Sequence, residues 1–114
     1  MVDVSPEGVT LHVTDLERSL AFYLKIPGAV LVHQRPGRFA LLRIGLGRLS
    51  LLQMGKPGFH VEIGTSNLDA LSAQLQQEGI EKSGPQPEQW GELGFIIKDP
   101  DGFSIEFDDH LHEE

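Results

Sequence analysis

The chain contains no cysteine, and its 114 residues include only one tryptophan and one tyrosine. The absence of cysteine excludes disulfides, thiol nucleophiles and zinc–thiolate sites. No apolar run approaches the roughly 18 residues that a membrane-spanning helix needs, so we expect no membrane partner. The opening residues, 1–7, lack the basic start and apolar core of a secretory signal, which favours a cytoplasmic protein.

Basic residues are also scarce in this chain. Lysine and arginine number 9 against 17 aspartates and glutamates, which gives a net charge of −8. Nucleic-acid binding favours a basic face, so we expect no nucleic-acid partner. An acidic surface can attract a cationic ligand, or it can simply keep the protein soluble. A chain of this length can bury a real core, and we assign residues 1–114 to a single domain.

The strongest pattern that is present is a near-repeat. Segments 13–20 and 65–71 each follow a short alternating strand, and each begins an amphipathic helix behind a polar residue. A repeat with a period of about 50 residues indicates two copies of one supersecondary unit. The segment Gly55 to Gly58 breaks the pattern, so we predict module one at residues 1–55 and module two at residues 58–109.

Each module is predicted to consist of a strand, a helix and three further strands. In module one, Asp15 caps a helix from about Leu16 to Lys25; in module two, Asn67 caps a helix that ends near Glu78. The predicted strands lie at about 9–14, 29–34, 39–44, 49–54, 59–64, 80–83, 92–98 and 103–108. A polar loop is expected at 85–91 and a tight turn at 99–102.

Two segments carry a family resemblance, DLERSLAFY at 15–23 and DPDGFSIEF at 99–107. Together with the order of the elements, they resemble the vicinal-oxygen-chelate superfamily, which includes glyoxalase I, bleomycin-resistance proteins, fosfomycin-resistance enzymes and extradiol dioxygenases. The resemblance implies an α+β fold in which two βαβββ modules form a curved eight-stranded mixed sheet. It implies a cup-shaped sheet with the helices on its outer face, and a homodimer.

Strand alternation predicts which side chains face the cup. The apolar residues of the first, fifth and last strands are expected to pack under the helices. The opposite face then carries His12, His60, Glu62 and Glu106. Polar residues gathered on a concave surface indicate a binding site, although a solvated sheet face is also polar.

The resemblance implies metal ligands on the first and last strands of each module. In module two these positions are His60 and Glu106; in module one they are Gly8 and either Ser50 or Leu52, none of which is a good ligand. Because catalytic divalent sites usually use three protein ligands, a third would come from Glu62, Gln53, a second chain or the bound ligand.

His12 is a poor replacement for a ligand at Gly8. It lies four residues further along the strand, roughly 13 Å at about 3.3 Å per residue. We therefore predict a degenerate metal site based on His60 and Glu106, with zinc, nickel, manganese or iron as the divalent ion.

Two classes of function fit these residues. The first is a protein that binds a small molecule in the cup, where Phe39, Phe95 and Trp90 are candidates to stack against a flat ligand; the two phenylalanines can equally fill the core. The second is a metal-dependent lyase, isomerase or dioxygenase in which Glu106 or Glu62 acts as the base. The incomplete ligand set favours the first class.

Overall fold

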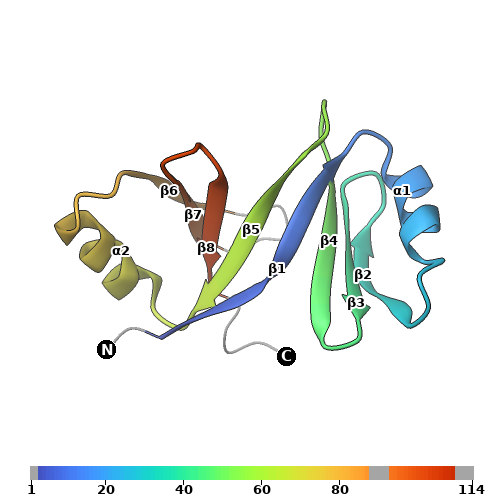
Figure 1. Cartoon of the computed structure of the whole chain (residues 1–114), viewed down its shortest axis with the longest axis horizontal. Helices are drawn as coiled ribbons and strands as arrows, with labels where there is room; N and C mark the ends of the chain where they lie inside the picture. Colours follow the sequence, from blue (N-terminus) through green and yellow to red (C-terminus); the bar gives the residue numbers. More distant parts are fainter. Residues whose placement is uncertain (1–2, 88–92, 110–114) are drawn as a thin grey trace. The chain divides into compact units, whose positions relative to one another are not determined.

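The computed structural model describes residues 3–87 and 93–109, and Figure 1 shows the arrangement of their helices and strands. The elements are β1 (Val4–Val13), α1 (Leu16–Tyr23), β2 (Ala29–Arg35), β3 (Phe39–Ile44), β4 (Gly47–Gln53), β5 (Gly58–Thr65), α2 (Leu68–Gln77), β6 (Lys82–Pro87), β7 (Leu93–Lys98) and β8 (Ser104–Asp108). No helix among these described residues is long and apolar enough to cross a membrane.

The strands form one mixed sheet in the order β2-β3-β4-β1-β5-β8-β7-β6. The first strand of each repeat is parallel to the last, because β1 pairs with β4 and β5 pairs with β8. The hairpins β2–β3, β3–β4, β6–β7 and β7–β8 are antiparallel. An eight-stranded mixed sheet with two helices confirms the predicted α+β class.

Two strand boundaries differ from the prediction by several residues, and the other differences are smaller. β1 begins at Val4 rather than near Val9, and β6 runs to Pro87, into the segment predicted as a loop. The register of β6 against β7 shifts between Ser83 and Gln86. β6 is at the edge of the sheet, where the missing N–H of a proline in the strand can be tolerated.

Contacts divide the chain into two compact units, residues 8–60 and residues 1–7 with 61–114. In the first unit α1 packs on β3 and β4 (Figure 1). Its core consists of Leu16, Leu20, Ala40, Leu42 and Leu51, with Leu11 and Val13 packed against it. The predicted apolar face of β1 therefore does lie under α1.

The second unit has a smaller core under α2. Leu71, Phe95 and Phe107 are its buried residues, and the two phenylalanine rings lie 5.4 Å apart between centroids. Ile63 of β5 and Ile105 of β8 pack against this cluster. The apolar faces of both strands thus point toward α2, which leaves the opposite face for the polar side chains that alternate with them.

Both predicted helix caps are confirmed. The Asp15 side chain accepts a hydrogen bond from the Arg18 backbone N–H at 3.1 Å, and the Asn67 side chain accepts one from Ala70 at 3.0 Å. Each bond satisfies a backbone donor that has no partner within its helix. The repeated caps therefore begin each helix directly after the strand that carries the candidate site residues.

Candidate metal centre

One histidine and two glutamates come together on β5 and β8. His60, Glu62 and Glu106 each offer one ligand atom, and these atoms all lie within 4.8 Å of one another. His60 and Glu62 share a face because they are two residues apart on the same strand. Glu62 pairs with Glu106 across the parallel β5–β8 ladder. The group therefore depends on only two neighbouring strands.

All three side chains are buried. His60 is 7% exposed, Glu62 6% and Glu106 2%, so these residues do not form a solvated polar face. Two carboxylates that are close together and removed from water are stabilised by a cation between them or by a proton on one of them. An imidazole nitrogen with two carboxylate oxygens is a donor set that suits divalent zinc, nickel, manganese or iron. The chemistry of the group therefore fits a divalent metal ion.

Module one lacks the corresponding donors. Thr10 of β1 pairs with Ser50 of β4 in the same parallel arrangement in which Glu62 pairs with Glu106. Ser50, and not Leu52, is therefore the counterpart of Glu106. The first module carries Gly8, Thr10 and Ser50 where the second carries His60, Glu62 and Glu106.

His12 contacts the metal-ligand candidate His60 directly. Its Nε2 atom lies 2.9 Å from His60 Nδ1, and the two ring centroids are 5.1 Å apart. Along its own strand, His12 is distant from Gly8, the position where the resemblance implies a ligand. β1 and β5 are neighbours in the sheet, and this neighbourhood gives His12 its contact with His60 instead. No local sequence signal predicts this contact, because strand pairing is a tertiary property.

The remaining candidates have other positions. Gln53 Oε1 accepts a hydrogen bond from the Leu16 backbone N–H at 2.8 Å, at the start of α1. Phe95 is 1% exposed and belongs to the core under α2, and Phe39 is 3% exposed. The sequence allowed these rings either to stack against a ligand or to fill the core, and both rings are buried. Trp90 lies outside the described residues.

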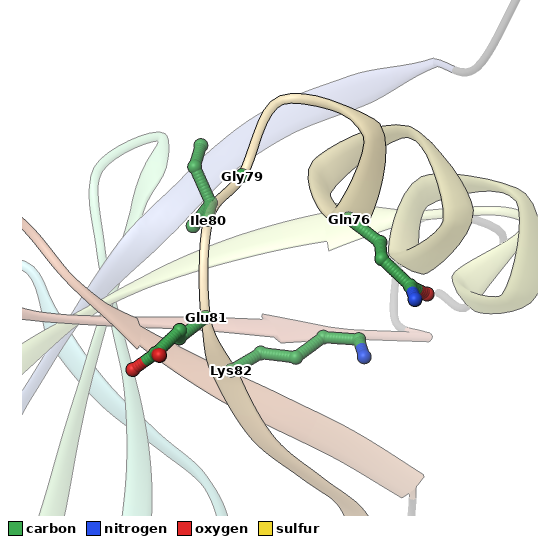
Figure 2. A pocket seen from close by; sticks show the side chains of 5 residues that line it. All are labelled: Gln76, Gly79, Ile80, Glu81 and Lys82. Carbon is green, nitrogen blue, oxygen red and sulfur yellow. The ribbon is translucent and has the colours of Figure 1, made fainter.

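Two hollows of the second unit are separate from the buried group. One, of about 410 Å³, is lined by Gln76, Gly79, Ile80, Glu81 and Lys82. Figure 2 shows that Gln76 comes from α2 and that Gly79, Ile80 and Glu81 come from the segment that leads into β6, whose first residue is Lys82. The second, of about 870 Å³, extends from this segment to the turn after β7. Neither lining includes His60, Glu62 or Glu106.

Comparison with protein families identifies the class to which this fold and site belong. The model of the Glyoxalase/Bleomycin resistance protein/Dioxygenase superfamily matches residues 7–107. The chain belongs to this superfamily, which confirms the resemblance seen in the sequence. Members of this superfamily typically depend on a metal and bind small-molecule substrates. The sequence has no significant match among curated proteins.

Solved structures support the same fold at low sequence identity. Methylmalonyl-CoA epimerase from Mycobacterium tuberculosis matches with a TM-score of 0.79 at 21% identity, over 91% of this chain and 86% of that one. A hypothetical protein from Bacillus halodurans gives 0.79 at 18% identity over 98% of both chains. An extradiol ring-cleaving dioxygenase from B. fuscum gives 0.71 at 20% identity, over 91% of this chain and 32% of that one.

Proposed function

We propose that this protein is a divalent-metal-dependent member of the superfamily that acts on a small molecule. The observation that carries the proposal is the buried group of His60, Glu62 and Glu106, whose ligand atoms lie within 4.8 Å of one another. Glu62 supplies the third ligand, for which the sequence offered several candidates. Three protein ligands are the usual number for a catalytic divalent ion.

The donor set favours a lyase or isomerase over a dioxygenase. Non-haem iron oxygenases typically use two histidines and one carboxylate, whereas this group has one histidine and two carboxylates. A bound divalent ion would supply Lewis-acid polarisation of a substrate oxygen. The substrate class would then be a small molecule with a carbonyl or two neighbouring oxygen atoms.

The two glutamates are the groups that can take up or return a proton. A carboxylate base removes a proton from a carbon next to a carbonyl, and we assign this role to Glu106 with Glu62 as the alternative. Their burial limits exchange with water, which helps a base return the same proton to its substrate. Epimerisation, the reaction named for one structural relative, belongs to this class of proton transfer.

Metal analysis of the purified protein tests the proposal. The protein, stripped with a chelator, is titrated with Zn²⁺, Mn²⁺ and Ni²⁺ by calorimetry, and bound metal is counted by elemental analysis. We expect about one ion per chain, lost in His60→Ala and Glu106→Gln. Glu17→Gln, which removes an exposed carboxylate on α1, is the matched control and should bind like the wild type.

A second candidate function is metal-free sequestration of a small molecule. It is favoured by Gly8 and Ser50, which occupy the two positions where the resemblance implies ligands from module one. Trp90 is the single tryptophan and gives a fluorescence signal for ligand binding. Absence of metal binding together with quenching of Trp90 by a planar cation would favour this second function over the first.

We also propose a cytoplasmic homodimer. β2 is an edge strand of the sheet. Three consecutive residues of this strand, Val30, Leu31 and Val32, are 57%, 38% and 50% exposed. Exposed apolar residues on an unpaired edge favour pairing with a second copy. Light scattering should give twice the chain mass for the wild type, and the monomer mass for Val30→Lys combined with Val32→Lys.

A further inference from the structure

The contact between His12 and His60 joins the candidate metal centre to a residue outside the ligand group. His12 Nε2 and His60 Nδ1 lie 2.9 Å apart, which is hydrogen-bond distance. In a bond between two neutral imidazoles, one ring donates its N–H and the other accepts it. The positions of the two nitrogens are compatible with either direction.

The direction of this bond decides which nitrogen of His60 can bind a cation. When His60 donates from Nδ1, its only proton is on that atom and Nε2 carries a lone pair. When His12 donates from Nε2, the proton of a neutral His60 is on its own Nε2, which then donates instead of binding metal. A metal-ligating histidine commonly has its second nitrogen fixed by such an outer partner.

We propose that His12 is a positioning residue that selects Nε2 of His60 as the metal-binding atom, and that the bond between the rings reverses when metal binds. This inference rests on the proposed function. Without metal, His60 carries its proton on Nε2 and accepts at Nδ1, and His12 donates from its Nε2. With metal, Nε2 of His60 carries no proton and its lone pair would bind the ion. Nδ1 of His60 then donates, and Nε2 of His12 accepts.

Each ring carries one proton in both forms, so the reversal balances. His60 Nε2 releases a proton, the proton shared between the rings moves from His12 to His60, and His12 gains one on Nδ1. The surroundings of that atom suit this exchange, because His12 is half-buried and Gly58 beside it is exposed. A Cβ built on Gly58 would lie 3.2 Å from His12 Nδ1, so Nδ1 is next to a surface residue.

Three substitutions separate the hydrogen bond from simple packing. Glutamine can accept through its oxygen or donate through its nitrogen, so His12→Gln keeps a bond of either direction, whereas His12→Leu abolishes it. We expect His12→Leu to weaken Zn²⁺ binding about 10–100-fold, and His12→Gln to stay within a few-fold of the wild type. His33→Leu, at an exposed histidine on β2, is the matched control and should leave the affinity unchanged.

Nitrogen NMR of the histidine rings tests the reversal without any activity measurement. With Zn²⁺ alone as the probe, we expect the His12 proton to move from Nε2 to Nδ1, although His12 is not a ligand. A His12 tautomer that stays the same on zinc binding would overturn the proposal. So would zinc bound directly to His12, or equal losses of affinity in His12→Gln and His12→Leu.

NMR spectra of the metal-free protein test the role of His12 independently of the proposed function. If the wild type binds no divalent ion, the proposed function fails, but the role of His12 is still measured. We expect Nδ1 of His60 to be hydrogen-bonded in the metal-free wild type and in His12→Gln, and its nitrogen resonance to shift in His12→Leu, where that bond is lost. The same His60 spectrum in all three proteins would overturn the inference, with or without a metal.

Discussion

Gly8 of β1 lies directly beside the carbonyl oxygen of Arg48 on β4. A Cβ built on Gly8 would be 2.3 Å from that oxygen, and the Gly8 φ angle is +154°. The position that resembles a metal-ligand position in module one is therefore closed to any side chain by the neighbouring backbone. Module one therefore lacks a histidine at this position for a steric reason, because its side chain would collide with β4.

Substitution of Gly8 is expected to destabilise the fold. For Gly8→Ala we expect a loss of about 2–3 kcal/mol in the free energy of unfolding, because the side chain adds backbone strain and overlap with Arg48. Gly45→Ala is the control: φ there is +61°, but no atom lies within 4 Å of the added Cβ. We expect about 1 kcal/mol there. Urea unfolding measures both, and equal losses would contradict the steric explanation.

Metal binding is expected to stabilise the folded chain. An ion that binds only the native state adds about 2.7 kcal/mol at a concentration 100 times its Kd. We therefore expect a higher melting temperature with Zn²⁺ and its reversal by a chelator. Glu62→Gln should reduce this shift sharply, because it removes one of the three ligand atoms. An unchanged shift in Glu62→Gln would exclude Glu62 as a ligand.

Phe95 is expected to contribute to stability and not to ligand binding. The ring is 1% exposed and packs with Leu71 and Phe107. Phe95→Leu should lower the free energy of unfolding by about 1–1.5 kcal/mol without changing metal affinity. Phe103→Leu is the matched control, since Phe103 is 51% exposed and should lose much less. A loss of metal binding in folded Phe95→Leu would contradict the core assignment.

The helix caps should each contribute measurably to folding. Asp15→Ala and Asn67→Ala remove the hydrogen bonds to Arg18 and Ala70, and we expect each to cost about 1 kcal/mol. Asp15→Asn keeps a cap acceptor and should cost less. Chemical denaturation measures the differences. Equal losses for Asp15→Asn and Asp15→Ala would show that the charge of Asp15, and not its hydrogen bond, is responsible.

Asp3 provides a pH-dependent contact near the start of β1. The hydroxyl of Ser66 donates to Asp3 Oδ1 at 2.5 Å, and this bond holds the pKa of the Asp3 carboxyl below its ordinary value. Because the folded-state pKa is lowered, the stabilisation is present above the ordinary carboxyl pKa. It is lost as the pH falls through the folded-state pKa. NMR titration of the Asp3 carboxyl should show its pKa rise in Ser66→Ala, whereas no change would contradict the assigned cause.

The sequence predicted much of the fold because its signals are local. Asp15 and Asn67 mark both helix starts by their own hydrogen-bonding chemistry. Alternation along β5 and β8 separates Ile63 and Ile105 from Glu62 and Glu106, since neighbouring side chains on a strand point to opposite faces. The edge strand β6 was predicted too short, because an irregular ladder with proline has no clear periodic pattern.

The composition and repeat of this chain thus determined its class, its helix positions and the face on which each polar strand residue lies. Only the tertiary structure decided that Glu62 joins His60 and Glu106, that Ser50 is the counterpart of Glu106, and that His12 contacts a residue 48 positions away. The physical reason is that alternation fixes a face but not a register. Which residues meet across two strands depends on backbone pairing between distant segments, and no single segment carries that information.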